Sequence, residues 1–302
     1  MSKRKALVTG GAGFIGSNLV DELIERGYEV IVIDDLSTGK KENINPKADF
    51  HELDVRDLKK IKPLFSGVDY VFHLAAIANI QFSLENPNES NDINLGGTLN
   101  VLTSARDAGV KKVVYSASSA AYGNQEKIPW HEDMQAELLS PYGLQKYASE
   151  LYCSLFSEVY DLPTVNLRYF NVYGKRQLLE GAYAPVVGIF IRNQLKGDPL
   201  IIFGDGEQTR DFVSVEDVVR ANILAAESKK VGKGEKINIG SGRSYSVNEL
   251  AKMVGGLTIN KPPRVEVKKC LAENSLAKKL LGWEPTVDLS EWLEAYKKEV
   301  GL

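Results

Sequence analysis

Two residues that can exchange protons, Tyr142 and Lys146, stand four positions apart in the segment SPYGLQK. Residues at this spacing share one face of a helix, which would begin just after Pro141. A tyrosine with its ordinary pKa of about 10 is a poor base at neutral pH, but a neighbouring ammonium favours the phenolate. The pair therefore suits proton transfer with a sugar or alcohol hydroxyl. Because the same spacing is common on plain helix surfaces, the pair needs support from elsewhere in the chain.

A serine run, Ser116-Ala-Ser118-Ser119, follows an apolar segment upstream of this pair. Its hydroxyls could hold a reacting oxygen and relay its proton. Serines after a strand are otherwise ordinary turn formers, so the run indicates a site only together with other site motifs.

A glycine pattern near the N-terminus indicates a bound dinucleotide. The segment KALVTGGAGFIGSN joins an apolar run to Gly10, Gly13 and Gly16 and then to a helical pattern. In a strand–turn–helix context these glycines allow the tight turn, the approach of the phosphates and close helix packing. The pyrophosphate would lie at the helix N-terminus. Alone, the triplet would also fit a sharp turn in another α/β protein.

An acid at the end of the next apolar segment, residues 28–33, supports the dinucleotide. Asp34 falls close to where the ribose-binding carboxylate of such folds lies, and that carboxylate repels a 2′-phosphate. The residues that follow are Asp35, Leu36 and Ser37, with no arginine among them. The sequence therefore predicts NAD rather than NADP.

The elements that position these residues alternate along the first half of the chain, which is typical of a doubly wound parallel sheet. Strands are expected at Ala6–Thr9, Glu29–Ile33, Phe50–Leu53, Tyr70–His73, Val113–Ser116 and Thr164–Arg168. Helices are expected at Phe14–Arg26, Asn91–Ala108 and Tyr142–Val159. Because ligands of open α/β sheets bind at the carboxyl ends of the strands, the polar residues there should line one crevice.

The pattern changes after residue 170, where prolines, glycines and mixed elements indicate a smaller mixed α/β lobe. The segment Lys229–Gly234 is expected to be an exposed loop, and Lys236–Ile239 a late strand of the sheet. The fold class is thus α/β, a Rossmann-type sheet with a smaller lobe. The predicted division is residues 1–170 plus 211–242 against residues 171–210 plus 243–302.

Composition limits the function classes. The chain has 302 residues, 43% hydrophobic and 25% charged, with a net charge of −3 and no basic block that would suit nucleic acid. No secretory signal pattern or membrane-length apolar run is expected. Two cysteines are too few for a disulfide framework and favour the cytoplasm. Three histidines without a cysteine cluster predict no metal site.

Together these motifs resemble the extended short-chain dehydrogenase/reductase family, and within it the UDP-hexose 4-epimerases, which include UDP-glucose and UDP-N-acetylglucosamine 4-epimerases. The shared motifs cover nearly the whole chain: TGGAGFIGSN, DDLSTG, HLAA, Asn94 before Gly97-Thr98, SASSAAYG, SPYGLQK, RYFNVYG, GDGEQTRDFVSVEDV and LLGWEP.

The resemblance implies that Tyr142 takes the 4-hydroxyl proton while C4 passes a hydride to bound NAD. The resulting 4-keto sugar turns about its diphosphate link, and the hydride returns to its other face. Lys146 would bind the nicotinamide ribose and lower the pKa of Tyr142, and Ser118 matches the catalytic hydroxyl.

The resemblance also implies the binding residues. The cofactor side, in the first of the two predicted parts, comprises Gly10, Gly13, Phe14, Ile15, Gly16, Asp34, Asp35, Leu36, Ser37, Gly39, Asp54, Val55, Leu74, Ala75, Ala76, Asn94, Ser116, Tyr142, Lys146 and Tyr169. The nucleotide-sugar side comprises Ser83, Ser118, Ser119, Tyr142, Asn171, Val187, Arg210, Arg264 and Cys270. Asn171 and Arg210 match diphosphate contacts; without the resemblance, Arg210 would be a solvated surface charge.

Two departures from sister enzymes discriminate among reactions. The related 4,6-dehydratases carry Asp-Glu where this chain has Ser119-Ala120, and the UDP-glucuronate decarboxylases carry Glu at Ala120, so lyase chemistry lacks a required group here. Cys270 matches the position beside the 2-substituent of the hexose, where a small residue admits an N-acetyl group. Cys270 is also compatible with a simple buried core position.

Alternatives remain open from the sequence. UDP-glucuronate 4-epimerisation would need only one basic contact to a carboxylate, and a non-catalytic NAD-binding protein could keep the same fold. The helical segments 91–108 and 142–159 resemble those that pair in family homodimers, although periodicity does not separate that from internal packing.

Overall fold

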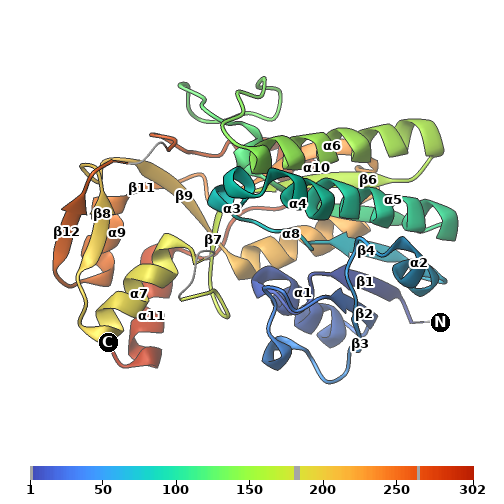
Figure 1. Ribbon diagram of the computed structural model, residues 1–302, viewed down its shortest axis with the longest axis horizontal. Helices are drawn as coiled ribbons and strands as arrows, with labels where there is room; N and C mark the ends of the chain where they lie inside the picture. The colour runs from blue at the N-terminus through green and yellow to red at the C-terminus, as the bar shows by residue number, and fades with distance from the viewer. Residues whose placement is uncertain (1–2, 180–183, 264–265) are drawn as a thin grey trace.

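The larger lobe of the computed structural model is built on one seven-stranded sheet (Figure 1). The structure describes residues 3–179, 184–263 and 266–302. The strand order is β10-β6-β5-β4-β1-β2-β3, and every neighbouring pair is parallel. The strands are β1 Lys5–Thr9, β2 Glu29–Asp34, β3 Asp49–Glu52, β4 Tyr70–His73, β5 Lys112–Ser118, β6 Thr164–Tyr169 and β10 Lys233–Ile239. The predicted doubly wound fold class is confirmed, with its switch point between β1 and β4.

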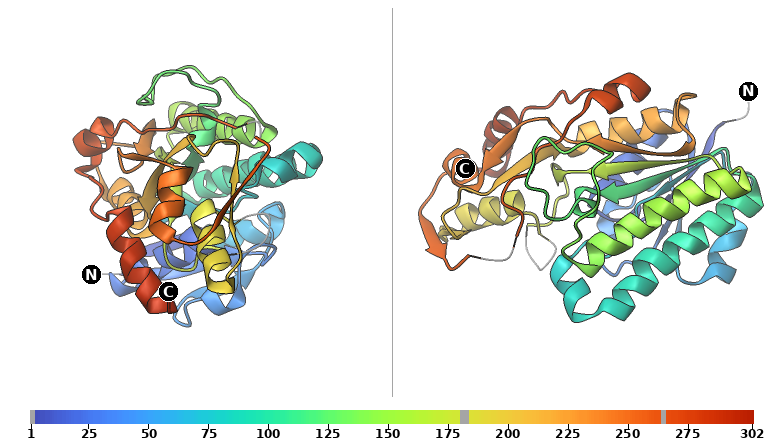
Figure 2. Two further views of the ribbon diagram at one scale, coloured as in Figure 1. Left: turned by 90° about the vertical axis from the view of Figure 1, so that its left-hand side faces the viewer. Right: turned by 90° about the horizontal axis from the view of Figure 1, so that it is seen from above.

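Helices cover both faces of this sheet because alternate strand residues point to opposite sides. Val8 packs in the core beneath one helix layer, whereas its neighbour Leu7 packs in the core beneath the other. The first layer contains α1 Phe14–Glu25, α8 Val215–Glu227 and α10 Ser275–Leu281. The second contains α2 Leu58–Ile61, α5 Gly97–Ala108 and α6 Pro141–Tyr160. Figure 2 shows α5 and α6 lying next to each other on the outer surface.

Two expected elements differ from the structure. The helix expected from Asn91 to Ala108 is instead α4 (Pro87–Asn91), a π-helical turn at Asp92–Gly96, and α5. Such turns carry an inserted residue and occur at functional sites. The loop expected at Lys229–Gly234 ends early, because Lys233 already pairs with β6 as the first residue of β10. The remaining predicted helices, and the strands apart from β10, agree within two residues at each end.

The smaller lobe packs around its own apolar core. It contains a three-stranded sheet in the order β11-β9-β7 and a two-stranded sheet of β12 and β8. The strands are β7 Asn171–Tyr173, β8 Leu200–Phe203, β9 Thr209–Ser214, β11 Ser244–Ser246 and β12 Thr258–Lys261. The helices are α7 Val186–Lys196, α9 Val247–Val254 and α11 Leu289–Val300; the short helix α3 (Ile80–Glu85) belongs to the larger lobe.

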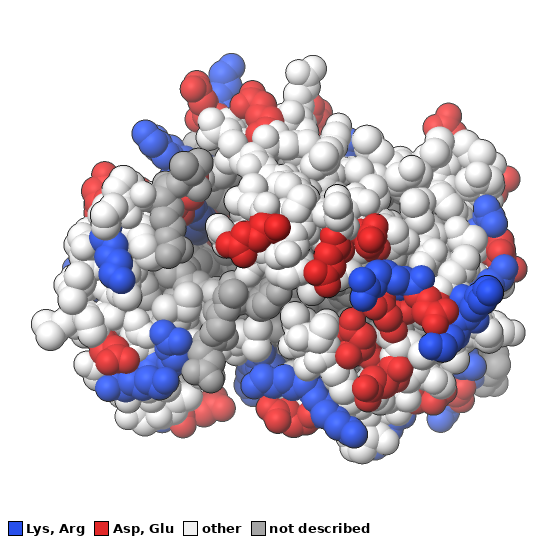
Figure 3. Space-filling view, viewed as in Figure 1, with Lys and Arg blue, Asp and Glu red and all other residues white. Residues whose placement is uncertain are grey.

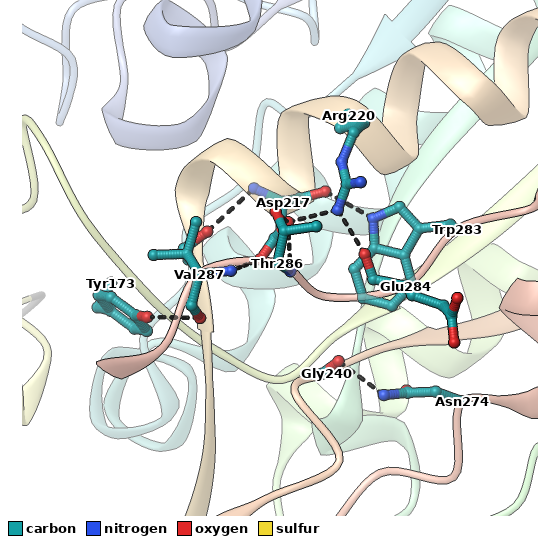
Figure 4. A network of polar contacts seen from close by, with 10 residues as sticks. Tyr173, Asp217, Arg220, Gly240, Asn274, Trp283, Glu284, Thr286 and Val287 are labelled. Carbon is teal, nitrogen blue, oxygen red and sulfur yellow. Dashed lines mark hydrogen bonds and ion pairs between the residues drawn. The ribbon is translucent and has the colours of Figure 1, made fainter. Parts of the chain in front are cut away.

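A polar network around Asp217 joins α8 to the segment that leads to α11 (Figure 4). The buried Asp217 carboxylate accepts hydrogen bonds from the Thr286 N–H at 2.9 Å, the Thr286 hydroxyl at 2.8 Å and the Val287 N–H at 3.1 Å. Trp283 donates its indole N–H to the Asp217 carbonyl at 2.9 Å. The C-terminal segment is thereby fixed to the larger lobe.

Among the described helices, none combines the length and apolar character needed to cross a membrane.

Candidate active site

A cleft opens at the carboxyl ends of strands β1 to β6, as expected for a doubly wound sheet. Most of the predicted cofactor residues line it: Gly10, Gly13, Phe14, Ile15, Gly16, Asp34, Asp35, Ser37, Asp54, Val55, Leu74, Ala75, Ala76, Ser116, Tyr142, Lys146 and Tyr169. The predicted catalytic hydroxyl, Ser118, lines it as well. Residues from six strand ends are therefore gathered in one place.

The glycine turn after β1 leaves no room for side chains. Gly10 has a φ of +72°, a left-handed conformation that favours glycine. A Cβ added at Gly16 would lie 2.1 Å from the Gly10 carbonyl oxygen, so α1 could not pack this close with any larger residue. This geometry leaves the backbone at the start of α1 open to a phosphate group.

Asp34 is held rigidly beside that turn. Its two carboxylate oxygens accept hydrogen bonds from the N–H groups of Ala12 and Leu36, both at 2.9 Å. Burial raises the pKa of Asp34, and these two hydrogen bonds oppose the rise. Each oxygen keeps a lone pair for a ribose hydroxyl, which fits an NAD-type adenosine and disfavours a 2′-phosphate.

Tyr142, Lys146 and Ser118 meet where α6 crosses the end of β5. Burial raises the pKa of Tyr142, and a hydrogen bond with Ser118 opposes the rise. Lys146 donates to the Ser116 carbonyl at 2.8 Å, and burial lowers the pKa of its ammonium to about 8. The tyrosine hydroxyl is thus directed at Ser118, whereas the lysine is bonded to the backbone of Ser116, two residues away along β5.

A directional hydrogen-bond chain lies beneath this site. Thr98 donates its hydroxyl to the Asn94 carbonyl at 2.6 Å, so it can only accept from His73 Nε2 at 2.9 Å. His73 Nδ1 must then accept from the Thr9 hydroxyl at 2.7 Å, and Thr9 in turn accepts from the Ala75 N–H at 3.2 Å. Burial lowers the pKa of His73 to about 3, so the ring is neutral and its tautomer is fixed.

Several predicted site residues support the cleft from behind. Asn94 holds the backbone of Ile77, accepting from its N–H at 2.8 Å and donating to its carbonyl at 3.2 Å. Ser83 accepts from the Tyr142 N–H at 3.1 Å and donates to the Ile80 carbonyl at 2.7 Å. These side chains therefore position groups that line the cleft. Neither Leu36 nor Gly39 lines it; a Cβ at Gly39 would lie 2.7 Å from the Asp34 carboxylate.

The predicted nucleotide-sugar residues are dispersed and are engaged with other parts of the chain. Asn171 donates to the Asp211 carbonyl at 3.1 Å, and Arg210 pairs with Glu266 and donates to the Val267 carbonyl at 2.8 Å. Cys270 is buried against an aromatic cluster, and burial raises its thiol pKa to about 12. Ser119 and Val187 also lie off the cleft lining, and Arg264 lies outside the described residues. Their binding roles stay predictions.

The cleft contains polar residues that the sequence did not single out. Thr38, Lys40 and Asn43 line it just beyond Asp34, and Arg176 lines it after β7. Lys40 lies 3.5 Å from Glu42, and Arg176 lies 2.7 Å from Asp21. Thr38 lies within the DDLSTG motif, and Lys40 and Asn43 follow it closely, so proximity in sequence could have indicated all three. Arg176 comes from a separate lobe, and nothing local in the sequence points to it.

These features together define a dinucleotide-binding α/β protein with a buried acid–base pair. Across the part of the chain that the structure describes, no group of three or more His, Cys, Asp or Glu side chains is arranged to hold a metal ion. The narrow glycine turn and the anchored Asp34 fit the pyrophosphate and adenosine ribose of NAD.

Comparison with known proteins identifies the family. The sequence model of the NAD dependent epimerase/dehydratase family matches residues 6–240, and the chain belongs to this family. A putative UDP-glucose 4-epimerase of Methanocaldococcus jannaschii is 44% identical over 297 residues, which cover 95% of each chain.

Solved structures agree with this assignment. The UDP-glucose 4-epimerase of Thermotoga maritima, solved with UDP-glucose, superposes with a TM-score of 0.93 at 44% identity, covering 98% of this chain and 99% of that one. A UDP-N-acetylglucosamine 4-epimerase from Methanobrevibacter ruminantium, in complex with UDP-N-acetylmuramic acid, gives 0.92 at 36% identity and covers 99% and 98%.

Proposed function

We propose that this protein is an NAD-dependent UDP-hexose 4-epimerase that inverts the 4-hydroxyl of UDP-glucose and UDP-galactose and of their N-acetylated counterparts. The observation that carries the proposal is the meeting of Ser118, Tyr142 and Lys146 in a cleft lined by the glycine turn and Asp34. The similar proteins named above, which act on UDP-glucose and UDP-N-acetylglucosamine, support the same reaction class.

Tyr142 is the acid–base residue of this proposal. Its phenol is buried and hydrogen-bonded to Ser118, so a proton taken from a sugar hydroxyl can be shared between the two side chains. Inversion needs the same oxygen to lose a proton and later regain it, and one buried Tyr–Ser pair can do both. Lys146 lies on the same helix face and supplies positive charge that favours the phenolate.

The cofactor would be held by the cleft residues from Gly10 to Tyr169, with Asp34 at the adenosine ribose. Bound NAD supplies a reversible hydride acceptor for C4 of the sugar. The residues of the chain hold the cofactor in place and exclude water around the reacting carbon, because Tyr142 and Lys146 are both buried.

Ala120 separates epimerisation from elimination on this scaffold. A dehydratase or decarboxylase needs an additional acid or base beside the oxidised sugar. Ala120 follows Ser119 in the short 3₁₀ turn Ser119–Ala121 at the end of β5, and its methyl group has no proton to give. The positions that carry these groups in sister enzymes therefore favour simple inversion.

The two lobes divide the work in this proposal. Residues 1–170 plus 211–242 would bind NAD, and residues 171–210 plus 243–302 would bind the nucleotide sugar. The small side chain of Cys270 would leave room for an N-acetyl group. Cys153 and Cys270 are both unpaired and buried, which fits a reducing compartment, and we propose that the protein is cytoplasmic.

Product analysis tests the function. Purified protein is incubated with UDP-galactose, and separately with UDP-N-acetylgalactosamine, without added NAD. We expect both to be converted to their 4-epimers by protein that retains NAD. Conversion of only one of the two would disprove the proposed activity on the other sugar type. If neither sugar is converted even with NAD supplied, the proposal is overturned. The remaining alternatives are then UDP-glucuronate 4-epimerisation and a non-catalytic NAD-binding protein.

We further propose that the protein is a homodimer that pairs through α6. One face of this helix exposes Leu144, Leu151, Leu155 and Val159, with between 46% and 56% of each residue accessible. The surface over α6 also carries few charged side chains in Figure 3, compared with the lower part of the same lobe. A contiguous apolar stripe of this kind is typical of a protein interface.

Sedimentation of a double variant, Leu151→Lys with Leu155→Lys, tests the dimer. We expect the wild type to sediment as a dimer and this variant as a monomer, because two charges on each copy would be buried without partners. Leu257→Lys is the matched control, since Leu257 is 82% exposed on the smaller lobe. A monomeric wild type would disprove the dimer.

A further inference from the structure

The carboxylate of Asp211 is fully buried, and its hydrogen-bond donors are all neutral. Its first oxygen accepts from the Ser241 N–H at 2.6 Å and the Ser241 hydroxyl at 2.8 Å. Its second oxygen accepts from the N–H groups of Gly242 and Ala272, both at 3.0 Å. A buried carboxylate with four donors aimed at it ties their segments together strongly, because leaving any of them unpaired is costly.

The segments joined by Asp211 come from three separate parts of the chain. Asp211 lies in β9, Gly242 follows β10, and Ala272 belongs to the stretch before α10. Their packing is close: a Cβ added at Gly240 would lie 2.5 Å from the Ala272 Cβ and 3.0 Å from the Asp211 carboxylate. Asn274 donates to the Gly240 carbonyl at 2.8 Å (Figure 4). No larger residue at position 240 would allow this approach.

Three successive residues of β9, Thr209 to Asp211, also hydrogen-bond to the segment 267–272. The Thr209 N–H donates to the Lys268 carbonyl at 2.9 Å, and Arg210 donates to the Val267 carbonyl at 2.8 Å. The Asp211 carboxylate accepts the Ala272 N–H at 3.0 Å, two residues beyond Cys270. Alternation along a strand places the side chains of Arg210 and Asp211 on opposite faces of β9.

We propose that Asp211 is a positioning residue that fixes Cys270 relative to Arg210, and so sets both diphosphate affinity and discrimination at the 2-substituent of the sugar. This inference rests on the proposed function, in which Cys270 leaves room for the 2-substituent, and on the predicted contact of Arg210 with the diphosphate. Asp211 has no contact with Tyr142, Lys146 or Ser118 among its hydrogen bonds, so it acts on binding and not on the chemical step.

The test compares Asp211→Asn with Asp217→Asn. Both residues are buried carboxylates that accept at least two backbone N–H groups and one hydroxyl. Asparagine has the shape of aspartate but turns an NH₂ toward donors, so each variant loses part of its network. Asp217 lies in the α8 network of Figure 4, and its hydrogen bonds involve Ser214, Arg220, Trp283, Thr286 and Val287, so its loss reports the purely structural effect.

For Asp211→Asn we expect kcat within about twofold of wild type, and KM for UDP-galactose and the dissociation constant of UDP both raised about tenfold. The kcat/KM ratio of UDP-N-acetylgalactosamine to UDP-galactose should fall at least threefold, because the larger sugar depends more on the placement of Cys270. Asp217→Asn should lower the melting temperature with KM and ratio unchanged.

If Asp211→Asn fails to fold, Ser241→Ala provides a milder perturbation of the same network. It removes one donor and keeps the carboxylate, and it should raise KM about twofold in the same direction. Unchanged KM and ratio in the folded Asp211 and Ser241 variants, or equal shifts in Asp217→Asn, would overturn the inference. A wild type that converts neither sugar would instead overturn the proposed function.

Discussion

The two sides of the cleft differ in how completely they are formed. On the larger lobe, Asp34, Tyr142 and Lys146 already line the cleft, and each is anchored by its own hydrogen bonds. On the smaller lobe, Asn171 and Arg210 are bonded to neighbouring parts of the protein. The proposed cofactor side is therefore preorganised, whereas the proposed nucleotide-sugar side would have to exchange internal contacts for ligand contacts.

This difference follows from what supports each side. The cofactor side rests on the parallel sheet, whose strand ends converge through backbone pairing alone. The proposed nucleotide-sugar side rests on two small sheets of three and two strands and on the segment 266–272, which is held mostly by side chains. A resident cofactor suits the first arrangement and an exchanging substrate suits the second.

The largest effect should come from Tyr142→Phe, which tests the preorganised side. Without the phenol the proposed acid–base group is lost, so kcat should fall about a thousandfold. Retained NAD, measured by absorbance after denaturation, should stay equal to wild type. Tyr147→Phe on the same helix is the control and should keep full activity. Wild-type rates in Tyr142→Phe would refute the mechanism.

An intermediate effect should come from His73→Gln, which tests the hydrogen-bonded series Thr9–His73–Thr98 beneath the cofactor side of the cleft. The pKa of His73 is about 3 in the fold against about 6.5 when unfolded, so only the unfolded chain binds a proton between these values. The free energy of unfolding should therefore decrease as the pH falls through this window. From pH 6.5 to 5 the loss should be about 2 kcal/mol in the wild type and absent from His73→Gln.

Chemical denaturation at several pH values measures this contribution as the difference between the two proteins. His51→Gln provides the control, because His51 is partly exposed on β3 and is not part of the hydrogen-bonded series Thr9–His73–Thr98. A wild type and His73→Gln with parallel pH profiles would contradict a buried neutral histidine.

The smallest effect should come from Glu266→Gln, which tests the side that must rearrange. Arg210 is paired with Glu266, and a diphosphate would have to displace this carboxylate. Removing the charge should therefore lower KM for UDP-galactose about threefold, because a partly exposed ion pair contributes modestly. Glu207→Gln in the same lobe should leave KM unchanged. A raised KM for Glu266→Gln would instead show that Glu266 holds Arg210 ready for its ligand.

The sequence predicted the cofactor side better than the nucleotide-sugar side for a physical reason. Gly10, Gly16 and Asp34 have roles that depend on local geometry and on parallel strand pairing, and both leave a pattern in the sequence. The shared network of Asp211 and Ala272 joins residues 61 positions apart through buried side chains. Nothing in local spacing marks such a contact, and the same is true of Arg176.

The break in the helix near Asn94 shows a second limit. The apolar pattern from Asn91 to Ala108 predicts one continuous helix, and the π-helical turn inside it keeps that pattern nearly intact. Its effect is to turn Asn94 toward the Ile77 backbone, which only the folded neighbours require. Sequence periodicity reports which residues are buried, and a one-residue insertion hardly changes that.

The position of β10 has a consequence for how the chain is made. β10 completes the edge of the large sheet beside β6, yet it is synthesised roughly 70 residues after β6. At the usual rate of translation that interval lasts roughly 4 to 14 s, during which β6 is a bare edge on the nascent chain. A fragment ending at residue 170 would keep that edge permanently. The dinucleotide-binding half should thus be difficult to obtain as a separate soluble piece, although most of its residues come first.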